Sequence, residues 1–95
     1  MFIVLLKFSN NKGLAGQFME GHKEWLQRGF NDDVFVLAGS LQPNLGGGIF
    51  AKNTSLSELE SRVKNDPFVA KNIVSAEIIE MTPSRAVEQL EFLLD

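Results

Sequence analysis

The start of the chain shows two patterns of hydrophobic residues, the first typical of a strand and the second typical of a helix. Residues 2–8 are apolar at almost every position, so both faces of an extended segment would be apolar, as in a central strand covered on both sides. From Leu14 to Leu26 the apolar side chains recur three or four positions apart, which is the spacing of one helix face. Gly29 then stands in the position of a helix C-cap. The pattern predicts a strand over 2–8 and a helix over about 13–28.

The middle of the chain predicts a hairpin. An apolar run at 34–38 predicts a second strand, and the segment 49–51, after the three glycines 46–48, predicts a short third strand. Residues 40–45 then form a connection that is longer than a tight turn. Successive glycines also occur in phosphate-binding loops, but a Lys-Ser/Thr pair and a helix N-terminus follow there, and neither follows here. We therefore expect a hairpin and no phosphate site.

The last forty or so residues predict a helix, a strand and a terminal helix. Ser55 and Glu58 match a capping box, so a second helix begins there and ends before Asn65. The alternation over 74–81 predicts a fourth strand, and the apolar cluster in 86–94 predicts a terminal amphipathic helix.

The element order is β-α-β-β-α-β. This order is typical of an α+β ferredoxin-like sandwich, in which two helices cover one face of a four-stranded antiparallel sheet, and here a C-terminal helical extension follows. We expect residues 1–95 to form a single domain. Because the first strand is apolar on both sides, the uncovered sheet face would expose a large apolar surface. The sequence thus predicts a homodimer packed sheet to sheet, with the terminal helix helping to cover the interface and larger oligomers left open.

Composition narrows the function classes. With nine basic and twelve acidic residues the net charge is −3, the basic residues are scattered, and the aromatic residues of the first strand have only Lys7 beside them, so we expect no nucleic-acid partner. The absence of cysteine excludes disulfides, thiolate nucleophiles and thiolate metal sites. One histidine and no run of alternating acids favour no metal site and no cofactor. No apolar stretch is long enough to cross a membrane, and we expect a cytoplasmic protein.

His22 is the only histidine, and therefore the only standard side chain with an ordinary titration near neutral pH. It lies one helical turn after Phe18 and one before Leu26, on the stripe expected to face the sheet. Two interpretations stay open for it: a general base, or a core-edge histidine that donates to a backbone carbonyl. Asp66 is the best placed acid to orient the ring, but Asp before Pro67 is also a common helix N-cap.

Other side chains complete a hypothetical cleft. Gly39 and Ser40, with Gln42, follow the second strand, where the polar side chains could donate hydrogen bonds to a developing oxyanion. Trp25 and Phe68 would serve as apolar walls, and Trp25 could equally belong to the core. Gly39-Ser40 lacks the glycine pattern of a serine hydrolase elbow, so nucleophilic serine chemistry is not expected.

Short segments along nearly the whole chain resemble the YciI-like (YCII-related) family. The matching pieces are Met1–Leu6, His22 with Trp25-Leu26, Gly29-Phe30, Val34–Ser40, Gln42-Pro43, Gly46–Ile49, Asn65–Val69 and Ile79–Arg85. The resemblance implies a ferredoxin-like fold, dimers or larger assemblies, and a cleft in which His22 faces Asp66. Two departures are Met19, where many members have Arg, and Gly39-Ser40, where many have Gly-Pro, so anion binding at position 19 has no support.

Two function classes follow from these observations. The family includes proteins of aromatic breakdown, among them a dehydrochlorinase of a chlorinated hydroxyhydroquinone. The first hypothesis is therefore a cofactor-independent enzyme of lyase or isomerase type, in which His22, oriented by Asp66, acts as general base on a small cyclic or aromatic substrate. The alternative is a non-catalytic module that binds a small molecule or serves assembly. Neither the substrate nor the role of residues 84–95 follows from the sequence, since fold similarity does not transfer a reaction.

Overall fold

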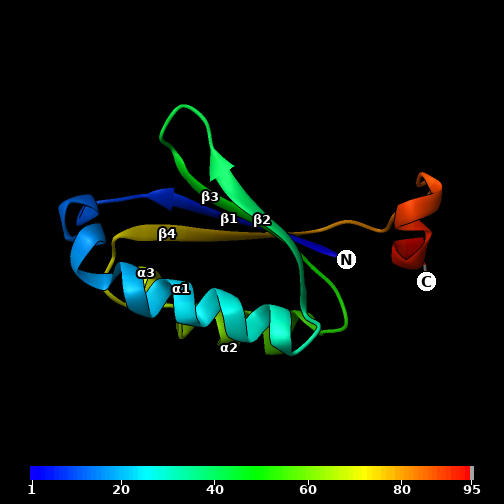
Figure 1. The fold of residues 1–95 in the computed structure, drawn as a ribbon, viewed down its shortest axis with the longest axis horizontal. Coiled ribbons are helices and arrows are strands. Elements are labelled where there is room, and N and C mark those ends of the chain that lie inside the picture. Colours follow the sequence, from blue (N-terminus) through cyan, green and yellow to red (C-terminus); the bar gives the residue numbers. More distant parts are fainter. Residues whose placement is uncertain (95) are drawn as a thin grey trace.

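A computed structural model describes residues 1–94, and Asp95, the last residue of the expected domain, lies outside the described residues. One antiparallel sheet lies above a layer of helices (Figure 1). The strands and α-helices are β1 (Phe2–Phe8), α1 (Ala15–Asn31), β2 (Phe35–Leu41), β3 (Gly46–Ala51), α2 (Leu56–Lys64), α3 (Pro67–Ala70) and β4 (Val74–Glu80). Two 3₁₀ helices span Lys12–Leu14 and Glu88–Leu94. The ferredoxin-like α+β fold predicted from the element order is confirmed.

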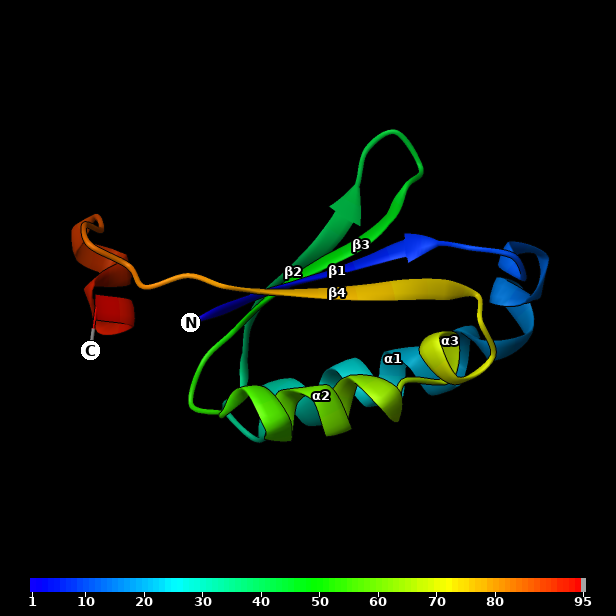
Figure 2. The same cartoon turned by 180° about the vertical axis from the view of Figure 1, so that it is seen from behind.

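The strand order in the sheet is β2-β3-β1-β4. β1 pairs with β3 on one side and with β4 on the other, both antiparallel, so the prediction of a central strand is confirmed. Seen from behind, the helices again lie along one face of the sheet and leave the other face uncovered (Figure 2). Alternate residues of β1 are buried against the helices: Phe2, Val4 and Leu6. The opposite set, Ile3 and Leu5, lies on the uncovered face and is only partly buried.

The end of α1 differs from the prediction. Gly29 is a buried residue inside the helix, which continues to Asn31, so its assignment as a C-cap was wrong. A Cβ atom at Gly29 would overlap the ring of Phe35 on β2. The glycine is therefore needed for the close approach of α1 to the sheet. The residue with a left-handed backbone conformation after the helix is Asp33, with φ 60°.

The β2–β3 hairpin is longer than predicted. β2 runs to Leu41 and β3 begins at Gly46, so Gly39 and Ser40, expected to end the second strand, and the glycines 46–48, expected to precede the third, all belong to strands. Gly39 pairs with Gly48 and Ser40 with Gly47. Backbone hydrogen bonds hold this part of the ladder together, and they need no strand-forming side chain.

α2 begins with the capping box that the sequence predicts. The Ser55 hydroxyl accepts a hydrogen bond from the backbone N–H of Glu58, and the Glu58 carboxylate accepts one from the N–H of Ser55. Hydrogen bonds from the Ser55 backbone and then from its hydroxyl lower the pKa of Glu58 below its usual 4.5. The start of α2 is thus fixed, and α2 leads directly into the segment that carries Asp66.

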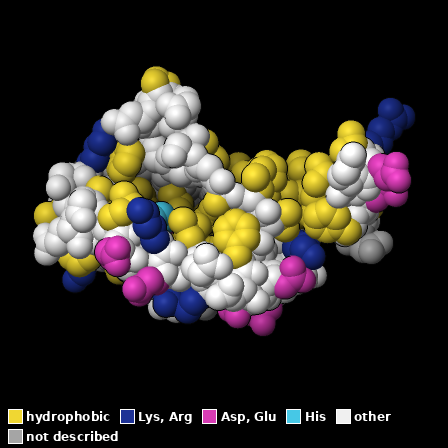
Figure 3. All heavy atoms as spheres, viewed as in Figure 1, with side chains coloured by type: hydrophobic (Ala, Val, Ile, Leu, Met, Phe, Trp, Pro, Cys, Tyr) yellow, Lys and Arg dark blue, Asp and Glu magenta, His cyan; other side chains and the backbone are white. Residues whose placement is uncertain are grey.

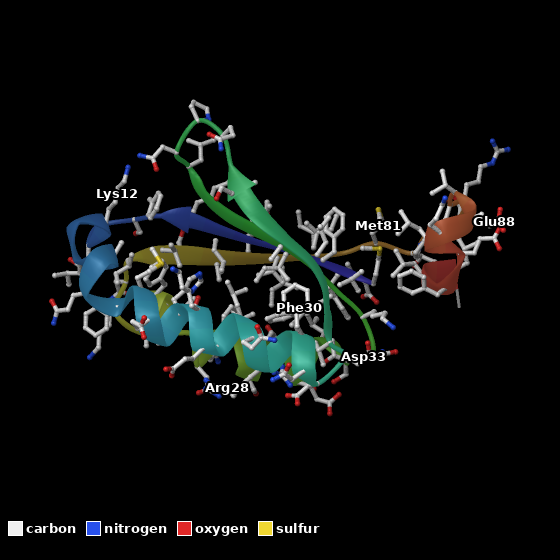
Figure 4. All side chains as sticks on the ribbon, in the orientation of Figure 1. Lys12, Arg28, Phe30, Asp33, Met81 and Glu88 are labelled. Atoms are coloured by element: carbon white, nitrogen blue, oxygen red, sulfur yellow. The ribbon has the colours of Figure 1, made fainter. Side chains whose placement is uncertain are left out.

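The chain end is a 3₁₀ helix, Glu88–Leu94, instead of the predicted amphipathic α-helix over 86–94. None of its residues is buried, and apolar side chains such as Val87 and Leu90 remain exposed. Figure 4 shows Met81 on an extended segment after β4 and Glu88 beyond it, on the part of the chain that projects from the sandwich. With so little apolar contact on its own chain, an α-helix there has no surface to pack against. No helix of the described residues is long and apolar enough to span a membrane.

Candidate functional site

A hydrogen-bonded contact joins α1 to the residue that caps α3: His22 Nδ1 lies 2.9 Å from Asp66 Oδ1. His22 projects from α1, and Asp66 stands immediately before α3. The imidazole is 15% exposed, whereas the Asp66 side chain is fully buried at 0%. Helical phase predicts that His22 lies on the side of α1 that faces the sheet, and the partly buried ring agrees with this prediction.

Asp66 combines the two roles that the sequence left open. It is the N-cap of α3, with Pro67 in the next position, and its Oδ1 accepts the backbone N–H of Phe68 at 3.0 Å. The same oxygen receives the contact from His22. When the Asp66 carboxylate is ionised, Oδ1 accepts from both groups, and the ring then donates from Nδ1. The second oxygen, Oδ2, is buried without a hydrogen-bond partner among the described residues.

The other ring nitrogen, Nε2, is open. In the part of the chain that the structure describes, the only buried side-chain N or O atom lacking a partner is Asp66 Oδ2, and no hydrogen bond involves Nε2. Nε2 is therefore accessible from outside the protein. When Nδ1 carries the proton, Nε2 holds a free lone pair, which is the arrangement required of a base.

Aromatic rings hold the imidazole in place. Phe68 stacks on His22 with 4.1 Å between ring centroids and 4° between the planes. Trp25 lies 5.9 Å from His22 and is itself 2% exposed. Its indole N–H donates to the carbonyl of Arg62 at 2.8 Å, so Trp25 links α1 to α2. The ring of His22 is thus fixed from α1, α2 and α3 together.

A cavity of about 330 Å³ opens beside His22, within the size range of small-molecule sites. From the sheet it is lined by Leu6, Phe8, Ala38, Gly39, Ser40, Gly46, Gly47, Gly48, Ile49 and Val74. From the helices it is lined by Met19, His22, Lys23, Leu26 and Phe68. Figure 3 shows the single histidine inside a hollow with hydrophobic side chains around it.

The glycines of the hairpin make room for this cavity. Gly47 lies directly opposite Ser40, and Ile49, two residues further along β3, is buried under the helices. Residues two apart on a strand share a face, so Gly47 and Ser40 face the helical layer. A Cβ atom on Gly47 would meet only the carbonyl oxygen of Gly39, at 3.4 Å, and no helix atom. The missing side chain therefore leaves the space open.

The site residues expected from the sequence fall into three groups. His22, Gly39, Ser40 and Phe68 line the cavity. Asp66 and Trp25 do not line it; both are buried. Gln42 lies in the hairpin turn and does not contribute to the lining.

Lys23 is a cavity residue that the sequence pattern does not predict. Helical phase assigns it to the solvated side of α1, and its residue position is indeed exposed. It nevertheless contributes to the cavity lining, since a lysine stem is long enough to reach along a surface. In the sequence, only its position next to His22 indicates that Lys23 could lie near the site. Across residues 1–94 no group of three or more His, Asp or Glu side chains is placed to hold a metal ion.

Comparisons with known proteins extend only to the fold. No family model matches the chain, and no curated protein matches it. A solved structure that it resembles is the 5-chloro-2-hydroxyhydroquinone dehydrochlorinase of Burkholderia phenoliruptrix in complex with 2,5-dihydroxybenzoquinone. The TM-score is 0.69 at 14% identity, over 85% of this chain and 93% of that one. The chain therefore shares its α+β ferredoxin-like fold with an enzyme that acts on a small ring compound.

Proposed function

We propose that the protein is a small enzyme without a cofactor in which His22 removes a proton from a small cyclic or aromatic substrate. The observation that carries this proposal is the contact of His22 Nδ1 with the buried Asp66 Oδ1 at 2.9 Å, with Nε2 left accessible beside a cavity. A carboxylate behind the ring fixes the tautomer and stabilises the imidazolium that forms. Lyase or isomerase chemistry at an acidic C–H or O–H needs no more than this proton transfer to begin.

The lining of the cavity supports a mainly apolar substrate. Leu6, Leu26 and Ile49 contribute aliphatic surface, and the hydroxyl of Ser40 has no hydrogen-bond partner among residues 1–94. Ser40 is therefore able to donate to an oxygen on which negative charge develops. The resemblance to the YciI-like family and the ring compound held by the fold neighbour favour the same substrate class. We also propose that the protein is a member of the YciI-like family and that it is located in the cytoplasm.

Turnover of candidate substrates tests the proposal. Wild type is incubated with 5-chloro-2-hydroxyhydroquinone and with related halogenated hydroquinones, and free chloride is measured. On a compound that wild type converts, His22→Asn is expected to lower kcat by about 10²–10⁴-fold, because the base is lost. Lys64→Gln, on the exposed end of α2, serves as a control that keeps the wild-type rate. A His22→Asn protein with full kcat would refute the role of His22.

Binding without turnover is the second candidate. The observation in its favour is that Asp66 Oδ1 is already engaged as the N-cap of α3, so the contact with His22 also has a purely structural use. Saturable binding to the cavity with no conversion of any compound would select this candidate. We also propose that two copies pair through the uncovered sheet face, as the apolar strand pattern predicts.

A further inference from the structure

Lys23 is the one acidic or basic side chain, apart from His22, among the residues that line the cavity. It forms no ion pair, hydrogen bond or cation–π contact with any residue from Met1 to Leu94. The rest of the lining is apolar side chains, glycine backbone and the hydroxyl of Ser40. An unpaired cation beside an apolar cavity favours an occupant that carries negative charge.

We propose that Lys23 binds the negative charge of a small aromatic or cyclic anion, and that the substrates are weak acids such as phenols whose anions are held in this cavity. The inference rests on the proposed function, since it assigns the counterpart of the charge that proton removal creates. Lys23 lies one position after His22 on α1, and neither the fold nor the family resemblance predicts an anion-binding group there.

Charge is balanced at each point of the proton transfer. The substrate O–H bond breaks, its proton moves to Nε2 of His22, and the electron pair stays on the substrate oxygen. The imidazolium is then paired with Asp66 through Nδ1, and the phenolate is paired with the ammonium of Lys23. Lys23 keeps its own proton throughout. The neutral acid becomes an anion beside the ammonium of Lys23, and the neutral base becomes a cation beside the carboxylate of Asp66, so each new charge meets an opposite charge that is already present, which favours the ionised state.

The charge of Asp66 does not oppose this arrangement. Asp66 is absent from the cavity lining and fully buried, and its Oδ1 accepts two hydrogen-bond contacts, from the Phe68 N–H and from His22. The occupant therefore touches the ammonium and the imidazole, and not the carboxylate. Glu20 and Glu24 flank Lys23 on α1, but both are exposed, neither forms an ion pair with Lys23, and neither lines the cavity.

The dye 4-nitrophenol is a suitable probe, because its anion is coloured and its neutral form is not. Its ionisation is followed by absorbance against pH with saturating protein. Wild type is expected to lower the apparent pKa of the bound probe by about one unit, which equals about tenfold tighter binding of the phenolate than of the phenol. Lys23→Gln is expected to abolish most of this preference, and Lys23→Arg to retain it.

Lys64→Gln provides the matched control, since it removes the same charge from α2 without touching the cavity. A phenolate preference that is equal in wild type and Lys23→Gln, or no binding of the probe by wild type, would overturn the inference. The imidazole signals of His22 in NMR spectra are read in the same samples. If Lys23→Gln loses the phenolate preference while His22 gains no proton from the neutral probe, the inference stands and the proposed base role fails.

Discussion

At the residue scale, Asp66 shows how a single side chain carries a local and a distant task at once. Its position before Pro67 makes it the N-cap of α3, which is a preference readable from the sequence. Its contact with His22, 44 residues earlier, depends on how α1 and α3 pack. The cap fixes the direction of the carboxylate, and that direction then serves the imidazole. The sequence indicates both roles but not that one oxygen fulfils them together.

The cavity provides a residue-scale prediction at Gly47. Replacement by Val places two methyl groups on the side of β3 that faces the helices, where a Cβ atom would meet only the Gly39 carbonyl. Valine suits a strand, so the free energy of unfolding should change by no more than about 1 kcal/mol. Binding of 4-nitrophenol should fall at least about tenfold, because an inserted side chain occupies volume in a small apolar site. Isothermal titration measures the affinity, and wild-type affinity in Gly47→Val would contradict the assigned cavity.

At the element scale, α1 carries the site and its packing against β2 sets the position of His22. Gly29 lets the helix approach Phe35, and Trp25 joins α1 to the last turn of α2 through the Arg62 carbonyl. These contacts fix the face of α1 from which His22 projects. A change in the helix–sheet distance would therefore move the imidazole relative to Asp66.

Two glycines of α1 test this packing in opposite directions. Gly29→Ala is expected to lower the free energy of unfolding by about 1–3 kcal/mol, because its Cβ overlaps the Phe35 ring. Gly16→Ala, in the same helix, meets nothing within 4 Å and should raise stability by up to about 1 kcal/mol through helix propensity. Denaturant unfolding of the two variants provides the measurement. Equal changes of the same sign would show that the close approach at Gly29 is not required.

The elements were predictable where the signal is local. The strand pattern of β1, the capping box of α2 and the helical phase of His22 depend on neighbouring residues, and all three appear in the structure. Gly29 was misassigned because its reason lies on β2 and not in α1. Gly39 and Ser40 were placed outside β2 because glycine carries no strand signal, although the ladder continues through them. The reach of Lys23 into the cavity depends on a side-chain path that residue spacing does not encode.

At the scale of the whole molecule, the uncovered sheet face carries an apolar row across all four strands. Ile3 lies opposite Phe50 on one side and Ile79 on the other, and Phe50 lies opposite Leu37. Leu37 is 57% exposed, Phe50 37% and Ile79 41%. The helical layer lies on the other face and cannot cover this row (Figures 1 and 2). The proposed homodimer would bury it.

Phe50→Glu tests the proposed homodimer, because it places a charge in the middle of the row. The wild-type protein is expected to sediment as a dimer, and the variant as a monomer at the same concentration, since a buried unpaired carboxylate is costly. Leu14→Lys, an exposed apolar residue just before α1, is the control and should remain dimeric. Sedimentation velocity distinguishes the species. A wild type that is monomeric at all concentrations would contradict the proposal.

The proposed general-base role in the whole molecule depends on which nitrogen of His22 carries the proton. Nitrogen-15 NMR of the labelled protein at a pH where the ring is neutral identifies the tautomer directly. With Asp66 Oδ1 accepting from the ring, wild type should show the proton on Nδ1 and a lone pair on Nε2, and Asp66→Ala should lose this preference. A proton on Nε2 in wild type, with the lone pair turned toward Asp66, would contradict the general-base account.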